Sequence, residues 1–77
     1  MYPELKKLQY LRKLHAYTCR EVGEKIGMSK VYYWQIEHGD RRLSYKNAEK
    51  IARFFQMNPD ELFYYDFLDS EYFSSLI

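Results

Sequence analysis

The chain has 77 residues, of which 47% are hydrophobic and 30% charged, with three Gly and two Pro, so it holds one small domain and is neither disordered nor fibrous. The formal net charge of +1 hides a separation: residues 1–53 contain all 12 basic and six of the 11 acidic residues, whereas residues 54–77 contain five acidic residues and no basic one. This asymmetry predicts an anionic partner, such as nucleic acid, for one part of the chain and a different partner for the other.

The first predicted helix covers about residues 3–15. A proline near its start favours this assignment, because the fixed φ of proline suits the first helical turn. The apolar residues recur every three or four positions and fill one broad face, which we expect to turn inward. They are Leu5, Leu8, Tyr10, Leu11 and Leu14.

Two short helices separated by a glycine turn follow. Thr18 and Glu21 have the spacing of a capping box, which predicts the start of a helix that ends at Gly27. Ser29 then caps a third helix, which ends at Gly39. A helix, a tight turn and a second helix make a helix-turn-helix. Its predicted inward residues are Val22, Ile26, Met28, Tyr33 and Ile36.

A basic loop and two further helices complete the chain. Ser44 caps a fourth helix that extends to about residue 55. Asn58, Pro59 and Glu61 give a strong start signal for a fifth helix, which we expect to continue to about residue 68 with a last turn at residues 70–73. The sequence therefore predicts an all-α, five-helix domain over residues 1–68 and a C-terminal tail over residues 69–77.

Several segments of the chain follow one another in a recognisable order and spacing. They are Leu11-Arg12, Thr18 to Glu21, Gly27-Met28-Ser29, Gln35-Ile36-Glu37-His38-Gly39 and Asn58-Pro59-Asp60-Glu61-Leu62-Phe63. In this order and spacing they resemble the phage Cro/repressor, or XRE-type, helix-turn-helix family, and the resemblance covers roughly residues 4–65. It implies a compact, lambda-repressor-like DNA-binding domain that acts as a dimer on a two-fold operator, most commonly as a transcriptional repressor.

The resemblance also implies roles for individual residues. The family's recognition helix matches residues 29–37, and its base-reading positions fall on Lys30, Val31 and Gln35. Lysine donates to guanine, glutamine pairs with adenine, and valine contacts the thymine methyl group. Arg12 and Glu37 match a pair that forms an internal salt bridge in relatives. Contacts to the DNA backbone are expected from Ser29, Tyr32, His38, Arg41 and Arg42.

Several positions depart from the family pattern. Cys19 stands where relatives commonly have a phosphate-binding glutamine, and at a helix start beside Arg20 its thiolate is expected to be favoured. Ala16 replaces a glycine, so we expect a differently built turn after the first helix. Tyr33 is larger and Gly23 smaller than the usual residues, and we interpret the two as a compensating pair.

The C-terminal region is both aromatic and acidic. Residues 54–77 contain eight of the 15 aromatic residues, more than a domain of this size can bury. An apolar surface rimmed by carboxylates is typical of a protein interface. We therefore expect homodimerisation, or binding of a protein partner, through Tyr64, Tyr65, Phe67, Tyr72 and Phe73.

Other functional classes lack the residues they need. Cys19 is the single cysteine and the two histidines are far apart, which argues against a disulfide, a metal site or another cofactor. We find no paired carboxylates, nucleophile with base, or phosphate loop, so we do not expect an enzyme. No segment approaches the ~20 apolar residues of a membrane span, and we expect a cytoplasmic protein.

The predicted function is a sequence-specific DNA-binding transcriptional regulator, a repressor that binds its operator as a dimer. The alternative is a protein-interaction module on the same fold, such as an antitoxin or a phage or mobile-element regulatory factor. Tyr32 and Trp34, which we expect to face outward on the third helix, support that alternative because such side chains suit a protein contact.

Overall fold

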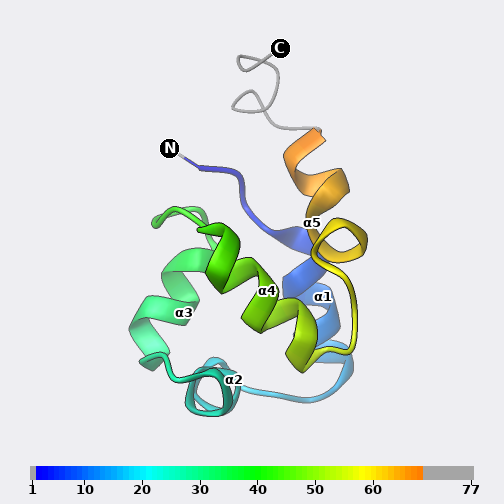
Figure 1. Cartoon of the computed structure of the whole chain (residues 1–77). Helices are drawn as coiled ribbons and strands as arrows, with labels where there is room; N and C mark the ends of the chain where they lie inside the picture. The colour runs from blue at the N-terminus through cyan, green and yellow to red at the C-terminus, as the bar shows by residue number, and fades with distance from the viewer. Residues whose placement is uncertain (1, 69–77) are drawn as a thin grey trace.

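The computed structural model describes residues 2–68, which form five α-helices and no strand. This confirms the predicted all-α, five-helix fold. The side chains of Tyr65, Phe67 and Leu68 are not described, and the predicted tail over residues 69–77 lies outside the described residues. The helices are α1 (Lys6–Leu14), α2 (Cys19–Ile26), α3 (Lys30–Glu37), α4 (Tyr45–Phe54) and α5 (Pro59–Leu68) (Figure 1).

The capping residues set the helix boundaries as predicted. Thr18 Oγ1 accepts a hydrogen bond from Glu21 N at 3.1 Å, and Glu21 Oε1 accepts one from Thr18 N at 2.9 Å, which completes the capping box of α2. The hydroxyls of Ser29 and Ser44 cap α3 and α4, each accepting from the amide three residues on, at 3.0 and 3.2 Å. Gly27 closes α2 in the left-handed conformation, with φ 79°.

The start of α1 differs from the prediction. The helix begins at Lys6 rather than near residue 3, and its N-cap, Leu5, makes no side-chain cap. The amide of Lys7 donates instead to Asp66 Oδ2 of α5 at 3.1 Å, and the amide of Leu5 donates to the carbonyl of Glu37 at 2.9 Å. A carboxylate at a helix N-terminus also interacts favourably with the helix dipole. Tertiary contacts therefore fix the start of α1.

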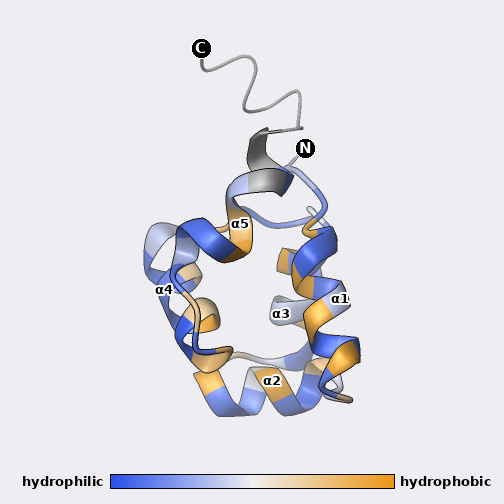
Figure 2. Cartoon of the chain, turned by 90° about the vertical axis from the view of Figure 1, so that its right-hand side faces the viewer, coloured by the Kyte–Doolittle hydropathy of each residue, from blue (hydrophilic) through white to orange (hydrophobic). Residues whose placement is uncertain are grey.

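The hydrophobic core lies among the five helices, whose apolar residues recur between polar ones along each helix (Figure 2). Tyr10 and Leu14, predicted on the inward face, are 63% and 62% exposed. They lie four residues apart on the outer side of α1, away from α3 and α5, against which α1 packs. The buried residues are Leu5, Leu8, Cys19, Val22, Tyr33, Ile36, Ala48, Ile51, Ala52, Leu62 and Phe63.

Gly23 lies where α2 approaches the turn that leads into α3. A Cβ atom at this position would lie 2.8 Å from the carbonyl oxygen of Met28 and 3.2 Å from that of Ser29. The three nearest neighbours of the missing Cβ are thus backbone atoms, and the interpretation of Gly23 and Tyr33 as a compensating pair stays a prediction. Glycine is needed here because the two backbones cross closely.

The turn after α1 contains a residue in the left-handed conformation. Ala16 has φ 61°, the region that glycine favours and that costs other residues energy. The expectation that this turn is built differently from that of relatives stays a prediction. The amide of Ala16 donates to the carbonyl of Lys13, and that of Tyr17 donates to the carbonyl of Arg12.

Candidate nucleic-acid interface

One side of α3 faces away from the core. Tyr33 and Ile36 are buried, whereas Lys30 and Val31 are exposed and Gln35 is half-buried. At about 100° per residue, the three predicted base-reading positions fall within an arc of about 140° around the helix, so they lie on one broad side of α3. The exposed fraction of Val31 is 63%, and its methyl groups are therefore available for contact.

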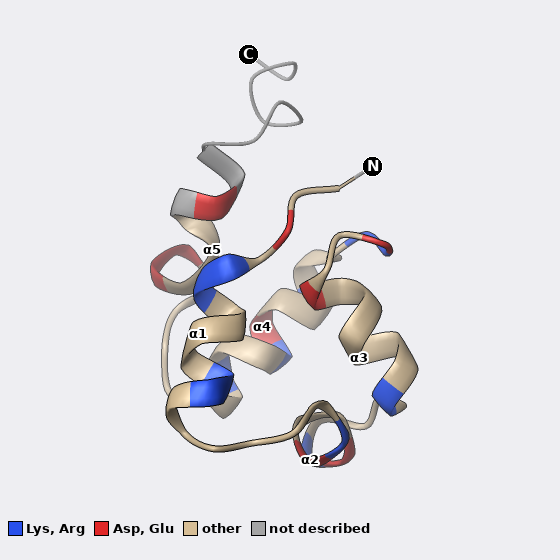
Figure 3. Ribbon diagram, turned by 180° about the vertical axis from the view of Figure 1, so that it is seen from behind, with Lys and Arg blue, Asp and Glu red and all other residues tan. Residues whose placement is uncertain are grey.

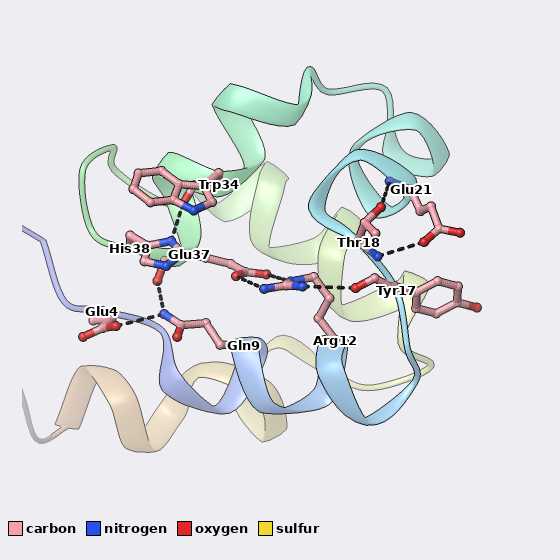
Figure 4. Close-up of polar contacts among 9 residues, drawn as sticks. All are labelled: Glu4, Gln9, Arg12, Tyr17, Thr18, Glu21, Trp34, Glu37 and His38. Carbon is pink, nitrogen blue, oxygen red and sulfur yellow. Dashed lines mark hydrogen bonds and ion pairs between the residues drawn. The ribbon is translucent and has the colours of Figure 1, made fainter.

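Trp34 lies in the middle of this outward face. It is 43% exposed, as expected of an outward residue, and its ring stacks on His38 with the ring centroids 4.0 Å apart. His38 Nδ1 lies 2.9 Å from the carbonyl oxygen of Trp34 (Figure 4). Sequence reasoning did not assign Trp34 a place among the DNA-contacting residues. The sequence did contain a signal for this position. Trp34 is three or four residues from Val31, Lys30 and His38, a spacing that places residues on the same side of a helix.

The residues predicted to contact the DNA backbone surround the same face. Ser29 lies at the start of α3, and its capping hydroxyl, which accepts from the amide of Tyr32, can still donate its own proton. Arg41 and Arg42 are exposed in the loop that follows α3. That loop is tied to the helix, because the amides of Asp40 and Arg41 donate to the carbonyl of Gln35 at 2.9 and 3.3 Å.

Tyr32 is more enclosed than predicted. It is half-buried and packs against the core, and its hydroxyl accepts a hydrogen bond from Asn47 Nδ2 of α4 at 3.3 Å. The guanidinium of Arg41 lies over its ring, 4.6 Å from the centroid. The expectation that Tyr32 faces outward is therefore wrong, because its ring lies between α4 and the Arg41 loop.

An ion pair holds the end of α3 against α1. Arg12 Nε donates to Glu37 Oε2 at 2.7 Å and Arg12 Nη2 donates to Glu37 Oε1 at 3.1 Å (Figure 4). Arg12 Nη1 also donates to the carbonyl of Tyr17 at 3.0 Å. The Glu37 side chain is fully buried, and its hydrogen bond to the guanidinium raises the pKa of Arg12. The pair expected from the resemblance is present as a two-point contact.

Two further buried groups lie near this pair. Burial, together with the Glu37 carboxylate, raises the pKa of the Cys19 thiol, so the favoured thiolate expected at this helix start is wrong. Desolvation outweighs the effect of nearby cations. Burial and Glu37 also raise the pKa of Tyr33. Among the described residues, the Tyr33 hydroxyl is the one buried side-chain polar atom without a partner of hydrogen-bonding geometry.

The charge separation of the sequence is partly retained in the fold. Lys and Arg lie on α1 to α4 and in the loop after α3, whereas α5 carries Asp and Glu (Figure 3). Within residues 2–68, no group of three or more His, Cys, Asp and Glu side chains is arranged to hold a metal ion. None of the described helices has the length and apolar character needed to cross a membrane.

A second exposed surface lies between α4 and α5. Tyr64, one of the predicted partner-contacting residues, is 51% exposed, and Tyr45 at the start of α4 is 74% exposed. Of the other predicted residues here, Tyr65 and Phe67 lie on α5 without described side chains, and Tyr72 and Phe73 lie outside the described residues. An open hollow of about 360 Å³ is lined by Leu43, Ser44, Tyr45, Ala48, Pro59, Asp60, Phe63 and Tyr64.

Comparisons with known proteins agree with this geometry. The helix-turn-helix family matches the chain over residues 8–62. A protein of Methanocaldococcus jannaschii, named an uncharacterized HTH-type transcriptional regulator, is 38% identical over 60 residues, which cover 78% of this chain and 91% of that protein. No solved structure matches the chain significantly.

Proposed function

Because the chain belongs to the XRE-type helix-turn-helix family, we propose that it is a sequence-specific DNA-binding repressor that places α3 in the major groove of a two-fold operator. It acts in the cytoplasm as a dimer and as a binding protein rather than an enzyme. The observation that carries this proposal is the exposed face of α3, where Lys30, Val31 and Gln35 lie together on a helix held by buried contacts.

The proposed contacts fall into two groups. Lys30, Val31 and Gln35 read base edges, because an ammonium group, an amide and methyl groups match the donors, acceptors and methyl groups of the major groove. The other group binds phosphates and so sets the register of the domain on the duplex. It consists of Ser29, Tyr32, His38, Arg41 and Arg42.

A mobility-shift assay on the DNA upstream of the protein's own gene tests this function. We expect binding that survives an excess of unrelated DNA and weakens as salt is raised, because phosphate contacts release counterions. Gln35→Ala should relax the preference at one base pair, and Arg42→Ala should weaken binding to all sequences alike. No sequence-dependent binding at low salt would refute the proposal.

The dimer is proposed to form through the α5 end of the molecule. Its support is the exposed Tyr64 beside the apolar hollow between α4 and α5. On DNA, two copies would then present their α3 helices to successive major grooves ~34 Å apart. Sedimentation of the full chain should show a dimer that Tyr64→Glu weakens, with Lys13→Glu, on the exposed side of α1, as the control. A monomer both free and on the operator would contradict it.

The alternative is a protein-interaction module such as an antitoxin. The specific observation in its favour is Trp34, an exposed aromatic ring at the centre of the α3 face, next to the apolar Val31. Trp34→Ala should impair operator binding if this face contacts DNA. Unchanged operator affinity in this variant, with loss of binding to the product of a neighbouring gene, would favour the alternative.

A further inference from the structure

The amide oxygen of Gln35 is already engaged. Arg41 Nε lies 3.0 Å from Gln35 Oε1. Arginine has only donors, so the Gln35 atom that faces it must be the carbonyl oxygen and not the nitrogen. The orientation of this amide, often ambiguous for glutamine, is therefore fixed by the chemistry of its partner.

The arginine that holds Gln35 is itself held in place. Its guanidinium lies 4.6 Å from the centroid of the Tyr32 ring, a cation–π contact. The Tyr32 hydroxyl accepts from Asn47 of α4, and the Tyr32 amide donates to the Ser29 hydroxyl. The Arg41 amide also donates to the carbonyl of Gln35. Arg41 and Gln35 are thus joined through both backbone and side chain.

This arrangement limits what Gln35 can present to DNA. A bidentate pair with adenine requires the glutamine oxygen and the NH₂ group to face the base together. The bond to Arg41 turns the oxygen toward the loop. The NH₂ group remains available, since no residue in the described part of the chain accepts from Gln35 Nε2. Gln35 therefore presents donors, and guanine offers two acceptors, O6 and N7, whereas adenine offers N7 beside a competing donor.

We propose that Arg41 is a positioning residue that makes Gln35 read guanine in place of adenine. The inference rests on the proposed function, because it concerns which base α3 selects. It changes the role of Arg41, which the family resemblance assigns to the DNA backbone alone. The two roles are compatible, because the Nη atoms of Arg41 remain available for a phosphate while Nε holds Gln35.

A lysine substitution separates the two roles. Arg41→Lys keeps the positive charge, and hence the attraction to phosphate, but has no N–H at the position of Nε. Arg42→Lys is the matched control: it is the neighbouring exposed arginine, and its side chain makes no hydrogen bond or ion pair within the described residues. Neither residue is buried, so both variants should fold.

The experiment measures dissociation constants for operators that differ only at the base pair read by Gln35. That base pair is identified as the one at which Gln35→Ala loses its preference. The wild type should bind the guanine operator about tenfold more tightly than the adenine one. Arg41→Lys should reduce this ratio about tenfold. Arg42→Lys alters only a proposed phosphate contact, so any loss of affinity should be equal for both operators and the ratio should stay the same. Adding Arg41→Lys to Gln35→Ala should change the ratio no further.

Each contrary outcome identifies what has failed. A wild-type preference for adenine, an unchanged ratio in Arg41→Lys, or a Gln35→Ala variant with no altered position would overturn the inference and leave the proposed function standing. A wild type without any sequence preference would overturn both.

Discussion

Glu37 places a carboxylate in the interior of a small domain, and its surroundings explain how it is tolerated. The side chain is fully buried but receives two hydrogen bonds from Arg12, at 2.7 and 3.1 Å. The backbone carbonyl of the same residue accepts from the Leu5 amide and from Gln9 Nε2. One residue therefore joins α3 both to α1 and to the segment before α1.

Replacing one partner of this ion pair should lower the free energy of unfolding more than replacing both partners. Arg12→Met leaves the buried Glu37 carboxylate unpaired and should lower the free energy of unfolding by about 3 kcal/mol. Arg12→Met combined with Glu37→Leu removes both charges and should recover most of that loss. Urea denaturation of the two variants checks this. Equal losses in the single and double variants would show that the charge is not the cause.

The Cys19 thiol should be unreactive in the folded protein. Because burial and Glu37 raise its pKa above the ordinary 9.0, the folded chain holds this proton more tightly than the unfolded chain does. The associated stability is fully present below the ordinary pKa of 9.0 and is lost as the pH rises through the folded value. Alkylation near neutral pH should therefore be slower in the native than in the urea-unfolded chain.

The pH dependence of unfolding gives the matching control. The stability of the wild type should fall as the pH rises above the ordinary thiol pKa of 9.0, and that of Cys19→Ala should fall less over the same range. Native alkylation as fast as that of the unfolded chain would show an accessible thiolate at this helix start and contradict the effect of burial.

At the scale of helices, the start of a helix could be predicted from the sequence wherever its capping residue directly precedes it. Thr18, Ser29 and Ser44 each precede their helices directly, so the sequence predicted these starts. The start of α1 could not be predicted, because its carboxylate, Asp66, is 59 positions away from Lys7 along the chain. Tyr32 was misjudged for the same reason: its partner Asn47 lies on another helix.

The turn between α1 and α2 offers a direct test of backbone strain. Ala16 has φ 61°, so Ala16→Gly should raise the free energy of unfolding by about 0.5–1 kcal/mol, the strain relieved exceeding the extra entropy of the unfolded chain. Ala48→Gly, inside α4, should instead lower it by about 1 kcal/mol. Thermal unfolding of both variants measures the contrast. Destabilisation by Ala16→Gly would show that the left-handed conformation is not strained.

For the whole molecule, the charge separation along the sequence is only partly retained in space. The acidic helix α5 packs against α1, where Lys7 Nζ donates to the carbonyl of Glu61 at 2.6 Å and the amide of Lys7 donates to Asp66. Lys and Arg residues occur along α1 to α4 (Figure 3). The number of charged residues could therefore suggest an anionic partner. It could not locate the candidate site, which was found from the residues of α3 that match the family.

The residues of the candidate site could be predicted from the sequence, but the contacts between them could not. The family resemblance placed Lys30, Val31 and Gln35 on the third helix, where Lys30 and Val31 are exposed and Gln35 is half-buried. The contact between Arg41 and Gln35 was not predictable, because it depends on the path of the loop after α3 and on the Tyr32 ring. Sequence alone thus assigned residues to the site but not the interactions that orient them.

Selection of bound DNA from a random pool tests most directly whether α3 reads DNA as part of a dimer. The wild type should enrich an inverted repeat whose half-sites lie about one helical turn apart. A Lys30→Ala, Gln35→Ala double variant, both positions being outside the core, should keep its fold and lose the enriched bases within each half-site. Recovery of no motif by the wild type, or of the same motif by the double variant, would contradict the assignment of α3 as the reading helix.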